Sequence, residues 1–266
     1  MKSESSPVNL YFEVHSFTDK MFHGNPAGVC PLDEWIEDSL MQQIAAENNL
    51  SETAFFVPKK DGYELRWFTP KIEVDLCGHA TLATAFVLFD HLEHEGEHIL
   101  FHTAGGDLTV KRSGSSFVMD FPSRLASQIE APKHLEKGLI CDTFEAYKAR
   151  DYMAVFDSEE IVRNIRPDFA ELDQLDCTGI IVTAPGDDVD FVSRFFAPQA
   201  GILEDPVTGS AHCTLAPYWA ERLDKTDLSA RQVSERGGEI ACRLVDDRVH
   251  IAGQAVLYFK GFLNTE

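Results

Sequence analysis

Residues 66–88 read Arg66-Trp-Phe-Thr-Pro-Lys-Ile-Glu-Val-Asp-Leu-Cys-Gly-His-Ala-Thr-Leu-Ala-Thr-Ala-Phe-Val-Leu88, and this stretch decides the fold. Its pattern predicts a strand, a short polar turn and a helix over residues 79–89. The predicted helix has almost no polar face, and a helix that is apolar all round must be buried. We therefore expect a sheet to wrap around it.

The same pattern recurs in the second half of the chain. Three pairs of segments echo each other in the same order, 128, 133 and 132 residues apart: Arg66-Trp-Phe-Thr-Pro70 and Arg194-Phe-Phe-Ala-Pro198, His79-Ala-Thr-Leu-Ala83 and His212-Cys-Thr-Leu-Ala216, and Gly105-Gly-Asp-Leu-Thr109 and Gly237-Gly-Glu-Ile-Ala241. Matching order and spacing indicate an internal duplication. A second buried helix is accordingly predicted over residues 211–223.

The duplication predicts an α+β fold with two pseudo-symmetric domains, residues 1–122 and 123–266. Each domain is expected to be a mostly antiparallel mixed sheet curled around its central helix, with the last strand able to return to the first half. Two local features are also predicted. Residues 22–29 contain two glycines and a proline and indicate a turn. Asp33 is expected to cap a helix that buries Trp35, Ile36 and Leu40.

Composition restricts the class of protein. The chain has 266 residues, 44% of them hydrophobic, which suffices for a sizeable core. A formal net charge of −21 argues against a nucleic-acid or anionic-membrane partner. The six cysteines form no Cys-x-x-Cys pair, so we expect reduced thiols. There is no apolar leader and no apolar run of about 18 residues, and we expect a soluble, cytoplasmic protein.

Both predicted helices begin at a glycine-bearing turn, one at Gly78 and the other at Gly209. Helix N-termini carry unpaired amides and partial positive charge, so they favour anions such as a carboxylate or an enolate oxygen. If the two halves face each other about a pseudo-twofold axis, both N-termini point into one shared cleft. An ionisable side chain precedes each glycine, Cys77 in the first turn and Asp205 in the second.

Other candidate groups are a carboxylate, a possible nucleophile pair and a histidine-rich segment. Glu52 begins a strand of mostly apolar residues, where a carboxylate can act as a proton shuttle. Cys77 and His79 are expected to diverge in direction, because residues two apart at a helix start do not face each other. His91, Glu93, His94 and His98 offer metal-ligand types, but such charges at a helix end usually meet solvent; no metal is predicted. No phosphate-binding loop signature is present.

Six motifs in order resemble the PhzF-like (phenazine biosynthesis-like) isomerase family, which is structurally related to diaminopimelate epimerase. They span nearly the whole chain: Asn25-Pro-Ala-Gly-Val29, Ser51-Glu-Thr-Ala-Phe55, Arg66-Trp-Phe-Thr-Pro70, Asp75-Leu-Cys-Gly-His-Ala-Thr81, Glu204-Asp-Pro-Val-Thr-Gly-Ser-Ala-His212 and Arg236-Gly-Gly238. The resemblance implies the two-domain fold, a homodimer and no cofactor.

The resemblance also implies roles for individual residues. The glutamate matching Glu52 moves a proton between carbons of a dihydro-anthranilate substrate in a well-understood member of the family. By the same match, the site would be lined by Gly78, His79, Asp205 and Ser210. In the epimerase relatives two cysteines act from opposite faces. Cys77 matches the first, and Asp205 stands where the second is expected.

We therefore predict a cofactor-independent isomerase that shifts a proton on a small carboxylate-bearing metabolite in a cleft between two domains. The predicted catalytic residues are Glu52, His79 and Asp205, and the predicted substrate-binding residues are Asn25, Cys77, Gly78, Gly209 and Ser210. One alternative is a two-base epimerase that uses Cys77 and Asp205. The other is a small-molecule binding protein without turnover.

Overall fold

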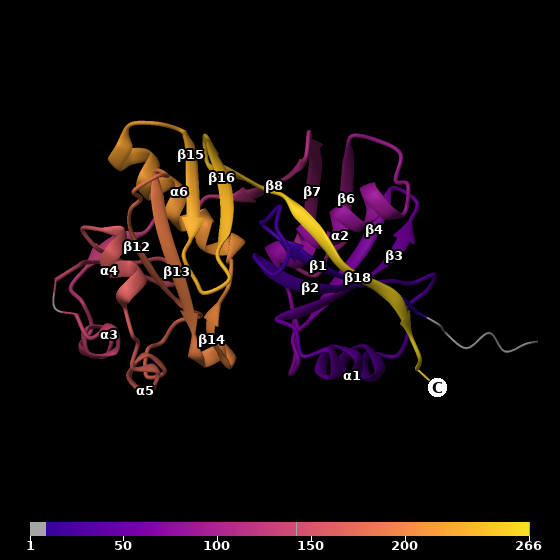
Figure 1. Cartoon of the computed structure of the whole chain (residues 1–266), viewed down its shortest axis with the longest axis horizontal. Helices are drawn as coiled ribbons and strands as arrows, with labels where there is room; N and C mark the ends of the chain where they lie inside the picture. The colour runs from indigo at the N-terminus through magenta and orange to yellow at the C-terminus, as the bar shows by residue number, and fades with distance from the viewer. Residues whose placement is uncertain (1–8, 142, 266) are drawn as a thin grey trace, which may run out of the picture. The chain divides into compact units, whose positions relative to one another are not determined.

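The computed structural model describes residues 9–141 and 143–265, which divide into two compact units (Figure 1). Unit 1 contains the residues up to Phe22, Pro26–Met119 and the residues from Gly253 onward. Unit 2 contains His23–Asn25 and Asp120–Ala252. Each unit combines a mixed sheet with a few helices, so the predicted α+β class is confirmed.

The elements of unit 1 are strands with two helices between them. In chain order they are β1 (Asn9–Ser16), β2 (Asn25–Pro31), α1 (Asp38–Asn48), β3 (Glu52–Lys59), β4 (Gly62–Phe68), β5 (Glu73–Val74), α2 (Gly78–His91), β6 (His98–Thr103), β7 (Gly106–Ser113), β8 (Ser116–Pro122) and, from the far end of the chain, β18 (Ala255–Leu263).

Unit 2 adds short helices to a similar set of strands. In chain order its elements are β9 (Ser127–Ile129), α3 (Lys133–Leu139), β10 (Glu145–Lys148), β11 (Tyr152–Val155), α4 (Glu159–Asn164), α5 (Phe169–Leu172), β12 (Ile180–Pro185), β13 (Phe191–Ala197), the 3-10 turn η1 (Pro198–Ala200), β14 (Ile202–Asp205), α6 (Gly209–Leu223), β15 (Asp227–Gln232), β16 (Gly238–Val245) and β17 (Arg248–Gly253).

The two units repeat one order of strand pairings. In unit 1, β2 pairs parallel with β3, β3 antiparallel with β4, and β4 antiparallel with β5 and parallel with β6; β7 then pairs antiparallel with β6 and β8. In unit 2, β11 to β17 repeat these pairings in the same order and the same sense. The central helix follows the fourth strand of the series each time. The predicted internal duplication is thereby confirmed.

One strand of unit 1 comes from the end of the chain. β18 pairs antiparallel with β1, from Asn9 opposite Leu263 to Ser16 opposite Ala255; in Figure 1 the yellow β18 runs beside the indigo β1. In unit 2, β9 pairs antiparallel with β10. In unit 1, β1 pairs with β2 and with β18; in unit 2, β10 pairs with β11 and with β9. Strand β18 of unit 1 therefore corresponds to strand β9 of unit 2.

The central helix of unit 1, α2, is buried along nearly its whole length, as predicted. It packs against β1, β3 and β18, and side chains such as Leu82 and Val87 have no exposed surface. Complete burial of one such side chain stabilises the fold by about 1.5–3 kcal/mol. Its threonines bond within the helix, since the Thr81 hydroxyl donates to the Cys77 carbonyl and the Thr84 hydroxyl to the Ala80 carbonyl. No buried hydroxyl of α2 is therefore left without an acceptor.

The central helix of unit 2, α6, contains a proline. Pro217 has no amide proton, so the carbonyl of Cys213 one turn earlier loses its usual partner. The backbone amide of Arg124 donates to that carbonyl at 2.8 Å instead. Further along the helix, Trp219 stacks on Phe191 with ring centroids 5.6 Å apart and donates its indole N–H to the Thr183 hydroxyl. These contacts keep the helix continuous and fix it to the sheet.

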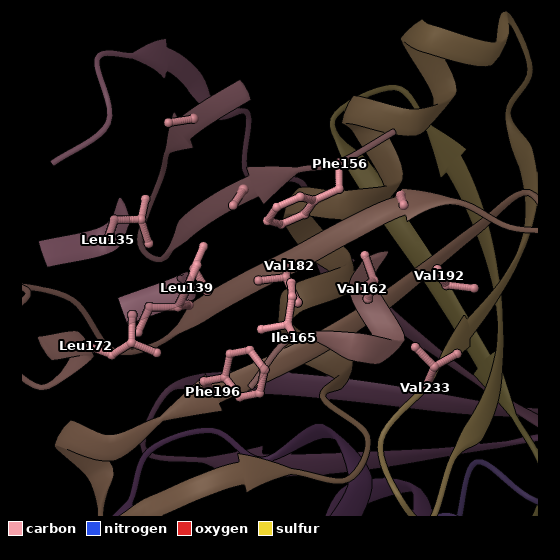
Figure 2. Close-up of a cluster of buried hydrophobic side chains, with 14 of the residues drawn as sticks. Leu135, Leu139, Phe156, Val162, Ile165, Leu172, Val182, Val192, Phe196 and Val233 are labelled. Carbon is pink, nitrogen blue, oxygen red and sulfur yellow. The ribbon is translucent and has the colours of Figure 1, made fainter. Parts of the chain in front are cut away.

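A second hydrophobic core in unit 2 lies between its strands and its short helices. Figure 2 shows Leu135 and Leu139 of α3, Val162 of α4 and Leu172 of α5 around Val182 of β12. Gly138 lies against this cluster, because a Cβ atom at this position would come within 2.3 Å of a Leu172 methyl group. The short helices α3 to α5 thus cover this part of the sheet without contributing to the candidate site.

Two local predictions are wrong. The predicted turn over residues 22–29 ends earlier, because β2 already begins at Asn25; its left-handed residues are Phe22, φ 66°, and Gly24, φ 68°. The first helix begins at Asp38 with Glu37 as its N-cap, not at Asp33. Trp35 packs against the core before the helix starts and donates its indole N–H to Glu64. Its side chain is partly buried from an irregular segment before the helix, which helical spacing alone did not reveal.

Across the residues that the structure describes, no helix combines the length and the apolar character needed to cross a membrane.

Candidate active site

The side chains of Glu52, His79 and Cys77 meet in unit 1 around one imidazole ring. Nε2 of His79 lies 3.1 Å from Oε2 of Glu52, and Nδ1 of the same ring lies 3.5 Å from Sγ of Cys77. The three groups are shielded, with side-chain exposures of 14% for Glu52 and 5% for His79, and Cys77 is 6% exposed as a residue. The ring is therefore placed between a carboxylate and a thiol.

Secondary structure brings these side chains together. Glu52 is the first residue of β3 and is in register with Ala27 of the neighbouring β2. Cys77 is the N-cap of α2 and His79 is its second residue. The hydroxyl of Ser16, at the end of β1, donates to the His79 carbonyl at 2.8 Å. That bond joins the start of the helix to the sheet and so fixes the backbone from which the His79 ring projects.

The expectation that Cys77 and His79 diverge is wrong. Cys77 has extended backbone dihedrals, φ −142° and ψ 108°, because it caps the helix and is not part of its first turn. The rule that side chains two apart point away from each other applies to residues inside a helix. A cap residue escapes it, and the Cys77 sulfur therefore reaches the His79 ring.

Burial and charge act in opposite directions on His79. Burial alone lowers the pKa of an imidazole, but the Cys77 sulfur and the Glu52 carboxylate beside it raise the pKa of His79 well above its ordinary value of 6.5. Burial raises the pKa of the Cys77 thiol to about 11, and the negative charge of Glu52 acts in the same direction. Because the Cys77 thiol is neutral at neutral pH, the charge that favours a protonated His79 there is that of the Glu52 carboxylate.

The ion pair leaves hydrogen-bonding capacity unused. Although Nε2 of His79 and Oε2 of Glu52 are 3.1 Å apart, neither atom makes an aligned hydrogen bond with any residue that the structure describes. Buried polar atoms are nearly always hydrogen-bonded, and exceptions are concentrated at reactive sites. Oε2 of Glu52 is thus a buried carboxylate oxygen whose one close polar neighbour among the described residues is the His79 ring.

The same three residues form a group with metal-ligand chemistry. Within the described ranges, they are the one set of such side chains whose ligand atoms lie within 4.8 Å of one another. However, Glu52 faces one ring nitrogen of His79 and Cys77 faces the other, and one cation cannot bind both nitrogens of a single ring. The histidine-rich segment around His94 and His98 forms no such group.

In unit 2, the carboxylate of Asp205 is held on both oxygens. Nδ2 of Asn25 donates to Oδ1 at 2.8 Å, and the Thr208 hydroxyl donates to Oδ2 at 2.5 Å. Asn25 also donates to the Val207 carbonyl and has no exposed surface. The predicted residue Asn25 therefore braces Asp205 from within the protein.

Gln232 completes this network and was missed by sequence reasoning. Its side-chain oxygen Oε1 accepts a hydrogen bond from the Thr208 backbone amide at 2.8 Å. Its side-chain nitrogen Nε2 donates to the backbone carbonyl of Asp205 at 2.7 Å. It is fully buried at the end of β15. No motif contains it, because its role depends on the pairing of β13 with β15, which a local pattern does not show.

The start of α6 holds the predicted residues Gly209 and Ser210, with Thr208 as the N-cap. Thr208 thus corresponds in unit 2 to Cys77, the N-cap of α2. The expectation that Asp205 stands at the equivalent of the second epimerase cysteine is therefore wrong, since Asp205 lies three residues before the cap. The sequence match of His79 with His212 does not hold in the structure. His79 is the second residue of α2, whereas the second residue of α6 is Ser210.

An arginine next to Ser210 was also missed. Nη2 of Arg150 lies 3.1 Å from the Ser210 hydroxyl oxygen, and the guanidinium pairs with Asp151 at 2.9 Å. Arg150 lies in the turn between β10 and β11 and belongs to no motif that we recognised in the sequence. A charged residue in an irregular turn gives no periodic signal, so only the fold reveals its position at α6.

Comparisons with known proteins agree with this geometry. Residues 14–261 match the profile of the family described as phenazine biosynthesis-like protein. An isomerase of Pseudomonas aeruginosa is 51% identical over 253 residues, which are 95% of this chain and 98% of the relative. A crystal structure of a PhzF family protein from Enterococcus faecalis has a TM-score of 0.94 and 48% identity, covering 97% of this chain and 99% of that one.

The fold extends to more distant enzymes. A hydroxyproline epimerase from Agrobacterium vitis has a TM-score of 0.62 at 13% identity, over 99% of this chain and 94% of that one, which shows a shared fold. Relatives that are 46–51% identical over 94–95% of this chain are named isomerases, and the protein is an isomerase. The chain belongs to the phenazine biosynthesis-like (PhzC-PhzF) protein family.

Proposed function

We propose that the protein is a cofactor-independent isomerase that moves a proton between carbons of a small carboxylate-bearing metabolite. Glu52 removes the proton from an activated carbon and returns it to another. The protonated His79 ring, 3.1 Å from Glu52, offsets the negative charge that develops on the substrate. Electrostatic stabilisation of this kind is usually the largest single contribution to catalysis.

The observation that carries the proposal is the shielded oxygen Oε2 of Glu52, which lies 3.1 Å from His79 Nε2 and has no aligned hydrogen bond to any described residue. A general base must have a lone pair that the protein does not already occupy. By contrast, both oxygens of Asp205 accept hydrogen bonds from Asn25 and Thr208. We assign Asp205 to holding the turn before α6, with the amides of Gly209 and Ser210 available to an anion.

The two-base alternative is disfavoured by the same observations. A thiol whose pKa is raised to about 11 is almost entirely protonated at neutral pH and is a poor base. The opposite partner, Asp205, is fully engaged, and the N-cap of α6 is a threonine. The expected placement of both helix N-termini in one cleft stays a prediction.

The first test replaces Glu52 by glutamine, which keeps the shape of the side chain but cannot shuttle a proton. We expect Glu52→Gln to reduce turnover by at least about 10²-fold, the lower limit for loss of a general base. The melting temperature and circular dichroism should remain those of the wild type. Glu47→Gln, at an exposed position of α1, is the matched control and should retain full activity. The assay screens a panel of cyclic and amino-acid carboxylates.

The second test follows the proton. In D₂O, a single shielded base returns much of the substrate's own hydrogen, so the product should contain solvent deuterium at less than the full amount. Two opposed bases instead supply the new hydrogen entirely from solvent. Complete deuterium incorporation at one stereocentre, together with an active Glu52→Gln variant, would refute the one-base mechanism.

A further inference from the structure

The sulfur of Cys77 and the nitrogen Nδ1 of His79 are as far apart as two ligands of one tetrahedral metal ion. Sγ and Nδ1 lie 3.5 Å from each other. Zinc binds a thiolate sulfur at about 2.3 Å and an imidazole nitrogen at about 2.0–2.1 Å, so a tetrahedral angle separates the two ligand atoms by about 3.5 Å. The distance between these two side chains in the structure therefore already suits a single ion.

Glu52 lies where a supporting carboxylate is found around a zinc-bound histidine. Its Oε2 is 3.1 Å from Nε2, the ring nitrogen of His79 that does not face Cys77. A histidine that binds a metal through one nitrogen almost always directs its other N–H to a carboxylate, a carbonyl or water, which fixes the tautomer and makes the ligand nitrogen more basic. Neither Oε2 nor Nε2 has another hydrogen-bond partner among the described residues. Only Nδ1 and Sγ then need to contact the ion.

The surroundings of Cys77 partly favour the thiolate, which is the form of cysteine that binds metals. Cys77 is the N-cap of α2, where the partial positive charge of the helix stabilises an anion. A hydrogen bond with the Ala80 backbone also lowers the pKa of the thiol, but burial outweighs it and keeps the free thiol protonated. The ion must therefore displace the thiol proton, which is released to solvent together with any proton on Nδ1.

The two ligand atoms select a borderline or soft divalent cation. Thiolate and imidazole suit zinc, whereas magnesium and calcium prefer oxygen ligands. No described residue outside Glu52, Cys77 and His79 belongs to the group. Structural zinc sites use four protein ligands and catalytic sites use three. Two protein ligands are thus suited to reversible binding and not to a resident cofactor.

We propose that Cys77 and His79 form a reversible binding site for zinc, in which Glu52 supports the histidine. The site lies wholly in unit 1 and goes beyond the proposed isomerase reaction, which needs no metal. An ion on Nδ1 places positive charge beside the ring, and the imidazole can then no longer hold a proton at that nitrogen. Zinc is therefore expected to inhibit the enzyme, and a chelator is expected to restore activity.

Binding is tested without substrate, by titrating cadmium, a softer ion of the same charge, into the metal-free protein. Cadmium bound to a thiolate gives an ultraviolet charge-transfer absorption that carboxylate and imidazole ligands on the surface do not produce. We expect one such ion per chain, and zinc should displace it. Cys77→Ser should abolish the absorption. Glu52→Gln should weaken cadmium binding by about 10- to 100-fold, the usual effect of losing a group that supports a ligand.

Cys141→Ser is the matched control, because Cys141 is a more exposed free thiol outside the group. This variant should keep the absorption and the affinity of the wild type. Melting temperatures confirm that each variant is folded. The readout also separates the two proposals, since a Glu52→Gln variant that turns over substrate but binds cadmium weakly would refute the one-base mechanism and leave the metal site intact.

Three results would overturn the site. The first is a wild type that shows no thiolate absorption in a large excess of cadmium. The second is an absorption that a folded Cys77→Ser variant retains or that Cys141→Ser loses, since the sulfur ligand would then be another cysteine. The third is unchanged cadmium affinity in Glu52→Gln, which would show that the carboxylate does not support a metal-binding histidine.

Discussion

The imidazole of His79 has a different neighbour at each ring nitrogen, and this determines what each residue of the site can do. Nε2 faces Glu52 and Nδ1 faces Cys77. The partner at one nitrogen fixes the orientation and proton of the other. Cys77 is thus a positioning residue for His79, although its neutral thiol takes no proton itself. A sulfur at this position orients the ring without competing for its charge.

Replacement of Cys77 tests this role. We expect Cys77→Ala to lower turnover by no more than about tenfold, or roughly 1.4 kcal/mol in the barrier. The pH profile of kcat/KM should shift, because Nδ1 of His79 loses its partner, whereas Cys77→Ser should keep a profile close to that of the wild type. A loss of 10²–10⁴-fold, the usual range for a general acid or base, would mean that the thiol transfers a proton. Melting temperatures separate a packing defect from a chemical one.

Sequence reasoning brought the unit 1 residues together but did not find all of those in unit 2. Glu52, His79 and Cys77 were all found because they lie in motifs that carry the family resemblance, although Cys77 and His79 were expected to diverge. Gln232 and Arg150 act across strand pairings and turns that join distant segments. Thr208 was passed over because the repeat of His79 in His212 suggested a register two residues away from the one that the helix caps define.

Among the elements, α6 shows how a buried helix accommodates a proline, Pro217, and a histidine, His212. Its proline is compensated by the Arg124 amide, and its histidine is held in the neutral form. Nδ1 of His212 bonds to the Thr208 carbonyl at 2.9 Å, and the ring packs against Phe191. Nε2 is buried with no hydrogen-bond partner among the described residues. A proton added to Nε2 would be a buried charge without a counter-ion.

The pH dependence of stability should reveal this histidine. Burial lowers the pKa of His212 to about 4, below its unfolded value of about 6.5. Its contribution to stability is therefore fully present above pH 6.5 and is lost as the pH falls towards 4. Between pH 7.5 and pH 4.5 the expected loss is about 2–3 kcal/mol.

Urea unfolding of the wild type and of His212→Asn at these two pH values measures that loss. Asparagine can still donate to the Thr208 carbonyl but does not titrate. The variant is expected to be less stable at pH 7.5, because it loses contact with Phe191. Its decrease in stability between the two pH values should nevertheless be smaller by about 2–3 kcal/mol. Identical decreases in both proteins would show that His212 is not the titrating group.

The elements themselves were predictable to different degrees. The apolar runs of α2 and α6 predicted buried helices because such runs have no other stable place in a folded chain. The start of α1 was not predictable, since Trp35 and Ile36 match helical spacing by coincidence and pack from an irregular segment before the helix. The parallel pairing of β4 with β6 also left no local signal, because its partners are separated by the whole of α2.

At the scale of the whole molecule, both units have the same strand pairings, but one strand of unit 1 comes from a different place in the sequence than its counterpart in unit 2. The outer strand of unit 2 is its first element, β9, whereas the corresponding strand of unit 1 is the last of the chain, β18. Echoed motifs predicted the two halves. They did not determine where β18 would pair, because the aromatic strand Ala255–Leu263 has no counterpart among the quoted repeats.

Removal of residues 254–266 should therefore destabilise unit 1, although most of unit 1 lies at the other end of the sequence. We expect amides of β1 and β3 to exchange hydrogen at least about tenfold faster, since β1 loses the partner strand that closes unit 1. Amides of β12 and β13 should remain protected, and turnover should be lost with the geometry of Glu52. Hydrogen–deuterium exchange with mass spectrometry distinguishes the two sets of strands.

A circular permutant supplies the control for that truncation. It begins at Gln254 and joins Leu263 to Asn9 through a short linker, so it keeps β18 next to β1. Its exchange pattern should be that of the wild type. Unchanged protection of β1 in the truncated protein, or loss of protection confined to unit 2, would show that β18 is dispensable for unit 1.

The position of β18 also reverses the usual order of events on the ribosome. Domains generally fold as units, with the N-terminal one first during synthesis. Here the unit that contains the N-terminal strands cannot close until residues 255–263 have been made, whereas every strand of unit 2 precedes them. Unit 2 can thus finish folding while β1 still lacks its neighbour. Until residues 255–263 have been made, the nascent chain carries Glu52 and His79 in a unit 1 sheet that still lacks one of its strands.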